Sequence, residues 1–182
     1  QWFSKNLQQV GAILAIVLLG SAVAGERELH TAIFLFSRPV SRGMILAAKV
    51  IVLLAGLVLA VLVSTGGAVL GAIIVGKAPQ LAFVLAATLH SVVALIAFAS
   101  LATLLSVLVP DSVKAMLFSG GIIIVLSVAG QFKPLRWLNP LAWFGSPNLI
   151  VRPVPQLAPI VVGVVLSACM LGISYYILER QE

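Results

Sequence analysis

Long apolar runs separated by short polar segments make up most of this chain of 182 residues. A helix that spans a bilayer needs about 20 consecutive, mostly apolar residues. Five stretches reach or approach that length, and we expect transmembrane helices at residues 8–24, 45–75, 81–109, 113–130 and 157–178. The strict alternation typical of a membrane β-barrel is absent. The pattern therefore predicts an all-α polytopic membrane protein, with residues 1–182 forming a single transmembrane domain.

The connections between the predicted spans are of two kinds. The turns at 76–79 and 110–112 are tight, and in the second turn Asp111 or Ser112 is suited to cap the helix that follows. The other two connections are longer and cover residues 25–43 and 131–156. Because an odd number of predicted spans separates the two long connections, they lie on opposite sides of the membrane.

Composition supports this assignment and excludes other classes of protein. The chain is 62% hydrophobic and only 9% charged, whereas soluble domains are about 25% charged. A soluble domain, a disordered chain and a nucleic-acid-binding domain are therefore excluded. The net charge of +6 comes from basic residues scattered at the ends of apolar runs, which is where they set topology. Because the chain begins at Gln1 without a signal-peptide pattern, we expect a preceding span to be missing, which would make six in the full-length chain.

The basic residues also predict an orientation, although they are almost evenly divided between the two sides. The connection at 25–43 is slightly favoured as cytoplasmic, which places the N-terminus of this sequence outside and the C-terminus inside. The opposite segment, 131–156, is rich in proline and contains Trp137 and Trp143, which suit an interfacial anchor. We interpret 131–156 as an extracytoplasmic re-entrant or interfacial helix pair, with an irregular loop as the alternative.

The most informative part of the sequence is the segment 25–49. Its apolar positions 29, 32, 33 and 36 share one face of a helical wheel, which indicates an amphipathic helix lying along the membrane surface. Glu26 and Glu28 fall in the first turn, where carboxylates suit the helix dipole. Pro39 ends this helix, and Ser41 is placed to cap the next span. From these residues alone, a simple connector between two spans remains an equal alternative.

Several residues of this segment together resemble the signature of type-2 ABC transporter permeases. The resemblance rests on the run Gly-Glu-Arg-Glu at 25–28, on Thr31, on the Leu/Phe-rich patch, on Pro-Val-Ser-Arg at 39–42 and on Lys49. His30 and Ala48 stand where glycines are usual in that family. The Asn139-Pro140 pair before the last span and the order of the spans agree with the resemblance.

The resemblance implies that residues 25–43 are a cytoplasmic coupling helix, which docks into a groove on an ATPase subunit. The residues that it assigns to ATPase coupling are Glu26, Arg27, Glu28, Thr31, Phe34, Leu35, Arg38, Pro39, Ser41 and Arg42. Two alternatives stay open. Glu26 pairs either with the ATPase or with a basic residue of its own chain, and Arg42 and Lys49 either bind a partner or hold the interface by snorkelling.

The resemblance also implies a set of partners. The family works as two permease halves with two ABC ATPase subunits, in membrane lipid and without nucleic acid. Since the chain has no phosphate-binding loop, we expect no enzymatic activity and no cofactor in this chain, with ATP and Mg²⁺ bound by the partner. The expected location is the inner membrane of a bacterium or archaeon, and the expected activity is export along a path formed by the dimer.

Ionisable residues within the predicted spans bear on the source of energy. An ion-driven transporter keeps such residues in its spans, whereas here His90 alone lies deep in one. We interpret His90 as hydrogen-bonded to a hydroxyl or carbonyl, and a proton relay is the alternative. A secondary transporter is therefore disfavoured, and a non-transporting membrane scaffold is the other alternative. We expect small residues to pack helices within the chain, or else to pack a dimer. These residues are Gly67, Gly71, Gly120, Gly121, Gly163 and Gly172.

Overall fold

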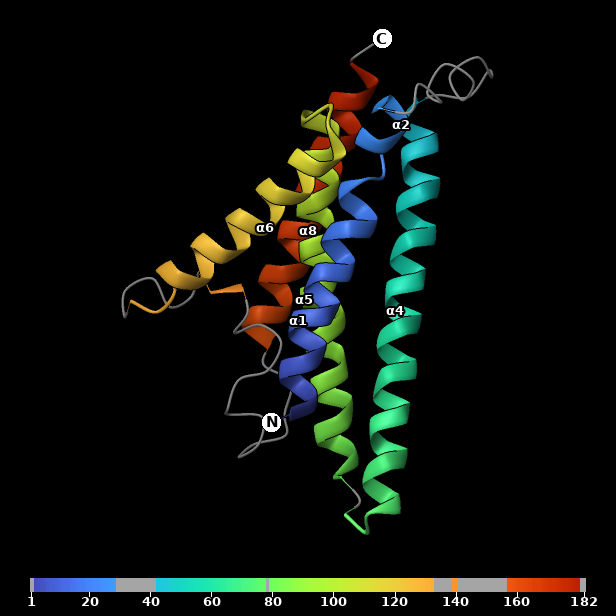
Figure 1. Cartoon of the computed structure of the whole chain (residues 1–182), viewed down its shortest axis with the longest axis vertical. Coiled ribbons are helices and arrows are strands. Elements are labelled where there is room, and N and C mark those ends of the chain that lie inside the picture. The colour runs from blue at the N-terminus through green and yellow to red at the C-terminus, as the bar shows by residue number, and fades with distance from the viewer. Residues whose placement is uncertain (1, 29–41, 78, 133–138, 141–156, 181–182) are drawn as a thin grey trace.

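The protein is a bundle of helices, most of which run along its long axis (Figure 1). The computed structural model describes residues 2–28, 42–77, 79–132, 139–140 and 157–180. Its helices are α1 (Trp2–Gly20), α2 (Ala24–Glu28), α4 (Arg42–Ile74), α5 (Leu81–Leu108), α6 (Ser112–Ala129) and α8 (Leu157–Glu179). None of these described residues lies in a strand. The prediction of an all-α polytopic membrane protein is confirmed.

Four of the helices are long and apolar enough to cross a membrane. They comprise Gly43–Ile74 within α4 and the whole of α5, α6 and α8. All four lie within a few residues of the predicted spans. The prediction for the first span is wrong at its C-terminal end, because α1 ends at Gly20 rather than at residue 24 and its apolar part is the shorter helix Val10–Gly20.

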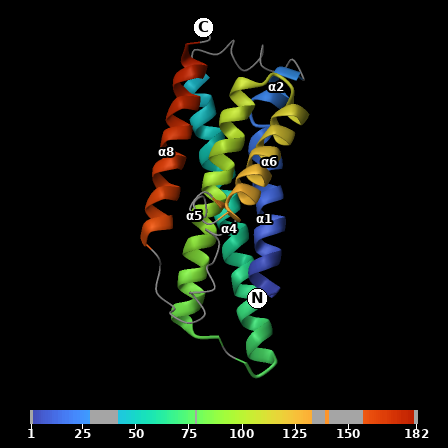
Figure 2. The ribbon, with the colours of Figure 1, turned by 90° about the vertical axis from the view of Figure 1, so that its left-hand side faces the viewer.

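Helix α5 is the central helix of the bundle. It packs against α1, α4, α6 and α8 (Figures 1 and 2). In its most apolar 18-residue window, 61% of the residues are buried, against 17% for α6 and α8 and 22% for α4. Small side chains let the neighbouring helices approach closely. The buried alanines of α5 are Ala86, Ala94, Ala97, Ala99 and Ala102. The remaining helices therefore present much of their apolar surface outward.

The turn between α4 and α5 follows from one glycine. Gly76 has a φ of 73°, in the left-handed region that glycine adopts without steric cost. The amide of Gly76 donates to the carbonyl of Ile73 at 2.9 Å, and that of Lys77 donates to Ala72 at 2.9 Å. These bonds satisfy carbonyls at the end of α4 that have no partner within the helix. The two long helices consequently form a hairpin.

The turn between α5 and α6 is fixed by Asp111. Its Oδ1 accepts a hydrogen bond of 3.1 Å from the amide of Lys114, so Asp111 is the N-cap that the sequence allowed. Its Oδ2 lies 3.2 Å from Lys114 Nζ. The backbone hydrogen bond from Lys114, followed by the contact with its ammonium group, lowers the pKa of the Asp111 carboxyl from its usual value of 3.8.

The ends of several helices meet at one end of the bundle, which we call the α2 end. Helix α2, the start of α4, the end of α5, the start of α6 and the end of α8 lie there (Figure 1). Gly43 packs so closely on Tyr175 that a Cβ at this position would overlap the aromatic ring. Tyr175 in turn donates a hydrogen bond of 2.7 Å to Glu179. The first turn of α4 and the last turns of α8 are thereby in contact.

Candidate functional site at the α1–α2 junction

The α1–α2 junction, residues 20–26, is where the chain leaves the first apolar helix for the acidic helix α2. The hydroxyl of Ser21 donates back to the carbonyl of Val17 at 3.0 Å and lies 3.3 Å from that of Leu18. Such bonds to the preceding turn slightly destabilise a helix and bend it. Gly20 also lies against Met116 of α6, where a Cβ would be only 2.9 Å from its Cγ. Both contacts lie where α1 ends, short of the end of the apolar run.

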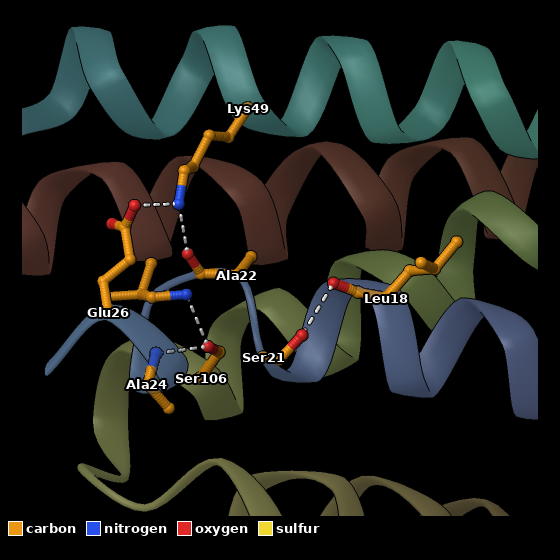
Figure 3. Close-up of polar contacts among 8 residues, drawn as sticks. Leu18, Ser21, Ala22, Ala24, Glu26, Lys49 and Ser106 are labelled. Carbon is orange, nitrogen blue, oxygen red and sulfur yellow. Dashed lines mark hydrogen bonds and ion pairs between the residues drawn. The ribbon is translucent and has the colours of Figure 1, made fainter. Parts of the chain in front are cut away.

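Ser106 of α5 holds the junction from one side. Its Oγ accepts two hydrogen bonds, from the amide of Val23 at 3.0 Å and from the amide of Ala24 at 2.9 Å (Figure 3). All three residues are buried. The first amides of a helix have no partner within that helix, and a buried amide without a partner is costly. A hydroxyl 82 residues away in the sequence from Ala24 therefore satisfies the start of α2.

Lys49 of α4 holds the junction from another side. Its Nζ forms an ion pair with Glu26 Oε1 and donates a hydrogen bond of 3.0 Å to the carbonyl of Ala22 (Figure 3). The two side chains are only 33% and 19% exposed. Of the two partners left open for Glu26, a basic residue of its own chain is the one found here. The ammonium group of Lys49 is correspondingly placed within the bundle.

The α1–α2 junction is a set of bonds and close contacts between helices. Described residues contain no group of three or more His, Cys, Asp or Glu side chains that could hold a metal ion. The junction instead connects α1 and α2 to α4 through Lys49, to α5 through Ser106 and to α6 through Met116. The junction is therefore in contact with three other helices at once.

Most of the residues assigned to ATPase coupling are not placed by the structure. Arg27 and Glu28 lie in α2 and Arg42 begins α4, but only their backbones are described. The remaining predicted coupling residues and both tryptophan anchors lie outside the described residues; they are Thr31, Phe34, Leu35, Arg38, Pro39, Ser41, Trp137 and Trp143. The predicted amphipathic helix and most of the segment 131–156 lie there too, so these stay predictions.

Comparison with known proteins decides the family. Residues 7–157 match the model of a family described as ABC-2 family transporter protein, and this range includes the whole junction. The chain belongs to the ABC-2 transporter family. No curated protein matches the chain. The protein is therefore a membrane permease of an ABC transporter, a class that works with an ABC ATPase and is generally not enzymatic itself.

In the permease, His90 is buried in the first half of α5. Its Nδ1 lies 2.8 Å from the carbonyl of Ala86, one turn earlier in the same helix. This is the kind of partner that the hydrogen-bonded interpretation of His90 requires. The ring is thus bonded to its own helix. Ser106, which contacts the α1–α2 junction, lies about four turns further along α5.

The glycines of the permease correct an expectation. Among the described residues, a Cβ added at only one of the six named positions meets another span: at Gly163 of α8 it would lie 2.6 Å from Cγ1 of Val93. At the other five positions, no other described side chain lies within 4 Å of the added Cβ. These are Gly67, Gly71, Gly120, Gly121 and Gly172. Packing within the chain was therefore the wrong prediction for them, because their faces point away from the bundle.

The sequence did not single out Ser106. Serines and threonines recur along the spans, and in most the hydroxyl donates to the carbonyl four residues earlier in its own helix. Nothing in the order of residues shows that Ser106 instead accepts from a segment near the start of the chain. The only hint in the sequence was that Ser106 lies in the last turn of α5, at the end of the span that is predicted to be on the same side as the connection 25–43.

Proposed function

We propose that this permease is one half of an ATP-driven exporter of the type-2 class. It works as a dimer with two ABC ATPase subunits, which bind the ATP and Mg²⁺. Residues 26–42 connect it to the ATPase at the α2 end, which faces the cytoplasm of a bacterial or archaeal cell. The observation that carries the proposal is the α1–α2 junction, where the start of the predicted coupling segment is bonded to α4 and α5.

The ion pair of Glu26 refines the roles within the coupling segment. Because Lys49 occupies this carboxylate, Glu26 sets the position of α2 within the permease. Contact with the ATPase then falls to residues from 27 onward, which continue from a fixed start. Glu26 and Glu28, which are two residues apart in α2, thus have different proposed roles that can be tested separately.

The ionisable residues of the described spans support a proposal in which the energy comes from an ATPase partner. Moving a charge into the apolar core of a bilayer is costly, so ion-coupled transporters place paired ionisable residues there. In the described spans, Lys49 is bonded at the α2 end and His90 is bonded to its own helix. These partners are a carboxylate of the junction and a backbone carbonyl, and the proposal draws its energy from an ATPase outside the permease.

The outward face of α6 supports a path formed between two copies. This helix leans away from the bundle (Figure 1), and its exposed side carries an open groove of about 310 Å³. The groove is lined by Leu117, Phe118, Gly121, Ile122, Val125 and Leu126. An apolar lining suits a lipid-like or amphiphilic substrate better than a hydrated ion. In the proposed dimer this face lines the path.

The proposal is tested by purifying the tagged permease with its ATPase and measuring ATP hydrolysis in nanodiscs. We expect Glu28→Ala to weaken ATPase binding about tenfold or more, the effect of losing one charge-assisted hydrogen bond. Glu26→Ala should weaken it indirectly, by releasing the junction. Lys77→Ala is the matched control, since it removes an exposed charge at the opposite end of α4 and α5. Unchanged binding and hydrolysis in both glutamate variants would refute the coupling assignment.

The orientation is tested separately by cysteine labelling in a Cys169→Ser background. Lys114 is exposed at the α2 end, and Lys77 is exposed at the tip of the α4–α5 hairpin. We expect a membrane-impermeant maleimide to label Lys77→Cys in intact cells and to label Lys114→Cys only after the cells are opened. The reverse result would place the α2 end outside.

A further inference from the structure

Ser106 differs from the other hydroxyls of the bundle in what it binds. Eight hydroxyls on α5, α6 and α8 donate to the carbonyl four residues earlier in their own helix. They are Thr88, Ser91, Ser100, Thr103, Ser119, Ser127, Ser167 and Ser174. Such bonds connect nothing beyond one helix. Ser106 accepts instead from two consecutive amides of the α1–α2 junction.

The two connections of the junction differ in stiffness. Lys49 reaches Ala22 and Glu26 through four methylene groups, so its ammonium group can follow a moving partner by changing rotamer. Ser106 bonds through an oxygen attached directly to Cβ, and its residue is completely buried. Two backbone amides share this one oxygen, which fixes the junction in both position and direction. A displacement of α2 is therefore transmitted to α5 more directly than to α4.

We propose that Ser106 is a positioning residue that joins the central helix α5 to the α1–α2 junction, so that movement of α2 shifts α5 together with α1 and α4. The inference rests on the proposed function, which supplies the movement. The coupling segment is joined along the chain to α1 and α4 but not to α5. Ser106 therefore adds a second route by which movement of that segment reaches the bundle. Since α5 contacts α1, α4, α6 and α8, its displacement reaches the whole bundle.

Hydrogen exchange measured by mass spectrometry tests the static part of this inference. In the full permease in nanodiscs, we expect Ser106→Ala to raise amide exchange in the peptide 21–26 by about tenfold or more, the equivalent of one lost hydrogen bond. Ser100→Ala is the matched control, because it removes a buried hydroxyl of α5 that bonds only within the helix. Equal exchange of this peptide in Ser106→Ala and wild type would overturn the inference.

The permease–ATPase complex tests the transmitted movement. We expect the wild type trapped with ATP and vanadate to change exchange both in peptide 21–28 and at the end of α5, in peptide 98–108. Ser106→Ala should keep the first change and lose the second, whereas Ser100→Ala should keep both. A wild-type complex in which 21–28 responds and 98–108 does not would refute the inference, and this result needs no variant to fold. If neither peptide responds, or no ATPase binds, the proposed function itself fails.

Discussion

The ion pair between Glu26 and Lys49 gives the sharpest prediction about the stability of the permease. We consider Glu26→Gln, which keeps the shape of the side chain, Lys49→Met, which keeps its length, and the double variant. The side chains are 19% and 33% exposed, so the pair lies between the exposed and buried classes. Exposed pairs contribute up to about 1 kcal/mol. Removing one partner of a buried pair costs about 3–5 kcal/mol.

We therefore expect each single variant to lose about 1–3 kcal/mol, with a coupling energy of about 1–2 kcal/mol between the two sites. Lys49→Met should be the more costly, because it also removes the hydrogen bond to the carbonyl of Ala22 and leaves the carboxylate of Glu26 without this partner. Glu26→Gln leaves that hydrogen bond in place.

The assay is reversible unfolding of the permease in mixed micelles of increasing SDS content, followed by circular dichroism. The pair of Lys114 with Asp111 is the matched control, because it joins neighbouring turns and is far more exposed. Its coupling should be smaller and more strongly reduced by salt. Additive effects of Glu26→Gln and Lys49→Met, within about 0.3 kcal/mol, would refute the reasoning that this pair fixes the junction.

Two further predictions concern other parts of the bundle. Gly163→Ala should destabilise the permease by about 1–3 kcal/mol in the same assay, because the new methyl group overpacks against Val93. Gly172→Ala in the same helix should be neutral or stabilise by up to about 1 kcal/mol, and equal losses would contradict the packing described. Because the pKa of Asp111 is lowered in the folded state, its contribution is complete above the usual value of 3.8 and is lost as the pH falls through the folded pKa. Melting temperatures should therefore fall more between pH 5 and pH 3 in wild type than in Asp111→Asn, and parallel curves would contradict this.

The positions of the long helices were predictable because they depend on local properties. Apolar runs must form helices in lipid, and the breaks between them contain the residues that end and begin helices, such as Gly76 and Asp111. Four of the spans consequently fall within a few residues of the predicted bounds. The family could likewise be inferred, because its signature is concentrated in one short segment.

What the sequence could not supply are the contacts between distant segments. Gly20 at the end of α1 lies against Met116, and the junction that follows is bonded to Ser106; both residues follow Gly20 by about half the chain. The partner of Glu26 was left open because Lys49 and a basic residue of an ATPase satisfy the same chemistry. The prediction that the glycines pack within the chain was wrong for a related reason. A small residue shows where another helix can approach, but not whether that helix belongs to the same chain.

The length of α4 links this permease to the thickness of its membrane. A helix of 33 residues is about 50 Å long, whereas the hydrocarbon core of a bilayer is about 30 Å thick. A typical tilt of about 20° still leaves α4 much longer than the core. The excess length must therefore lie in the headgroup region at one or both ends of α4, and the exposed Lys77 follows one of these ends. A span longer than the core is accommodated by tilting, by kinking or by local thickening of the bilayer, so the thickness of the membrane acts on the helix that carries Lys49 together with its packing on α1, α5 and α8.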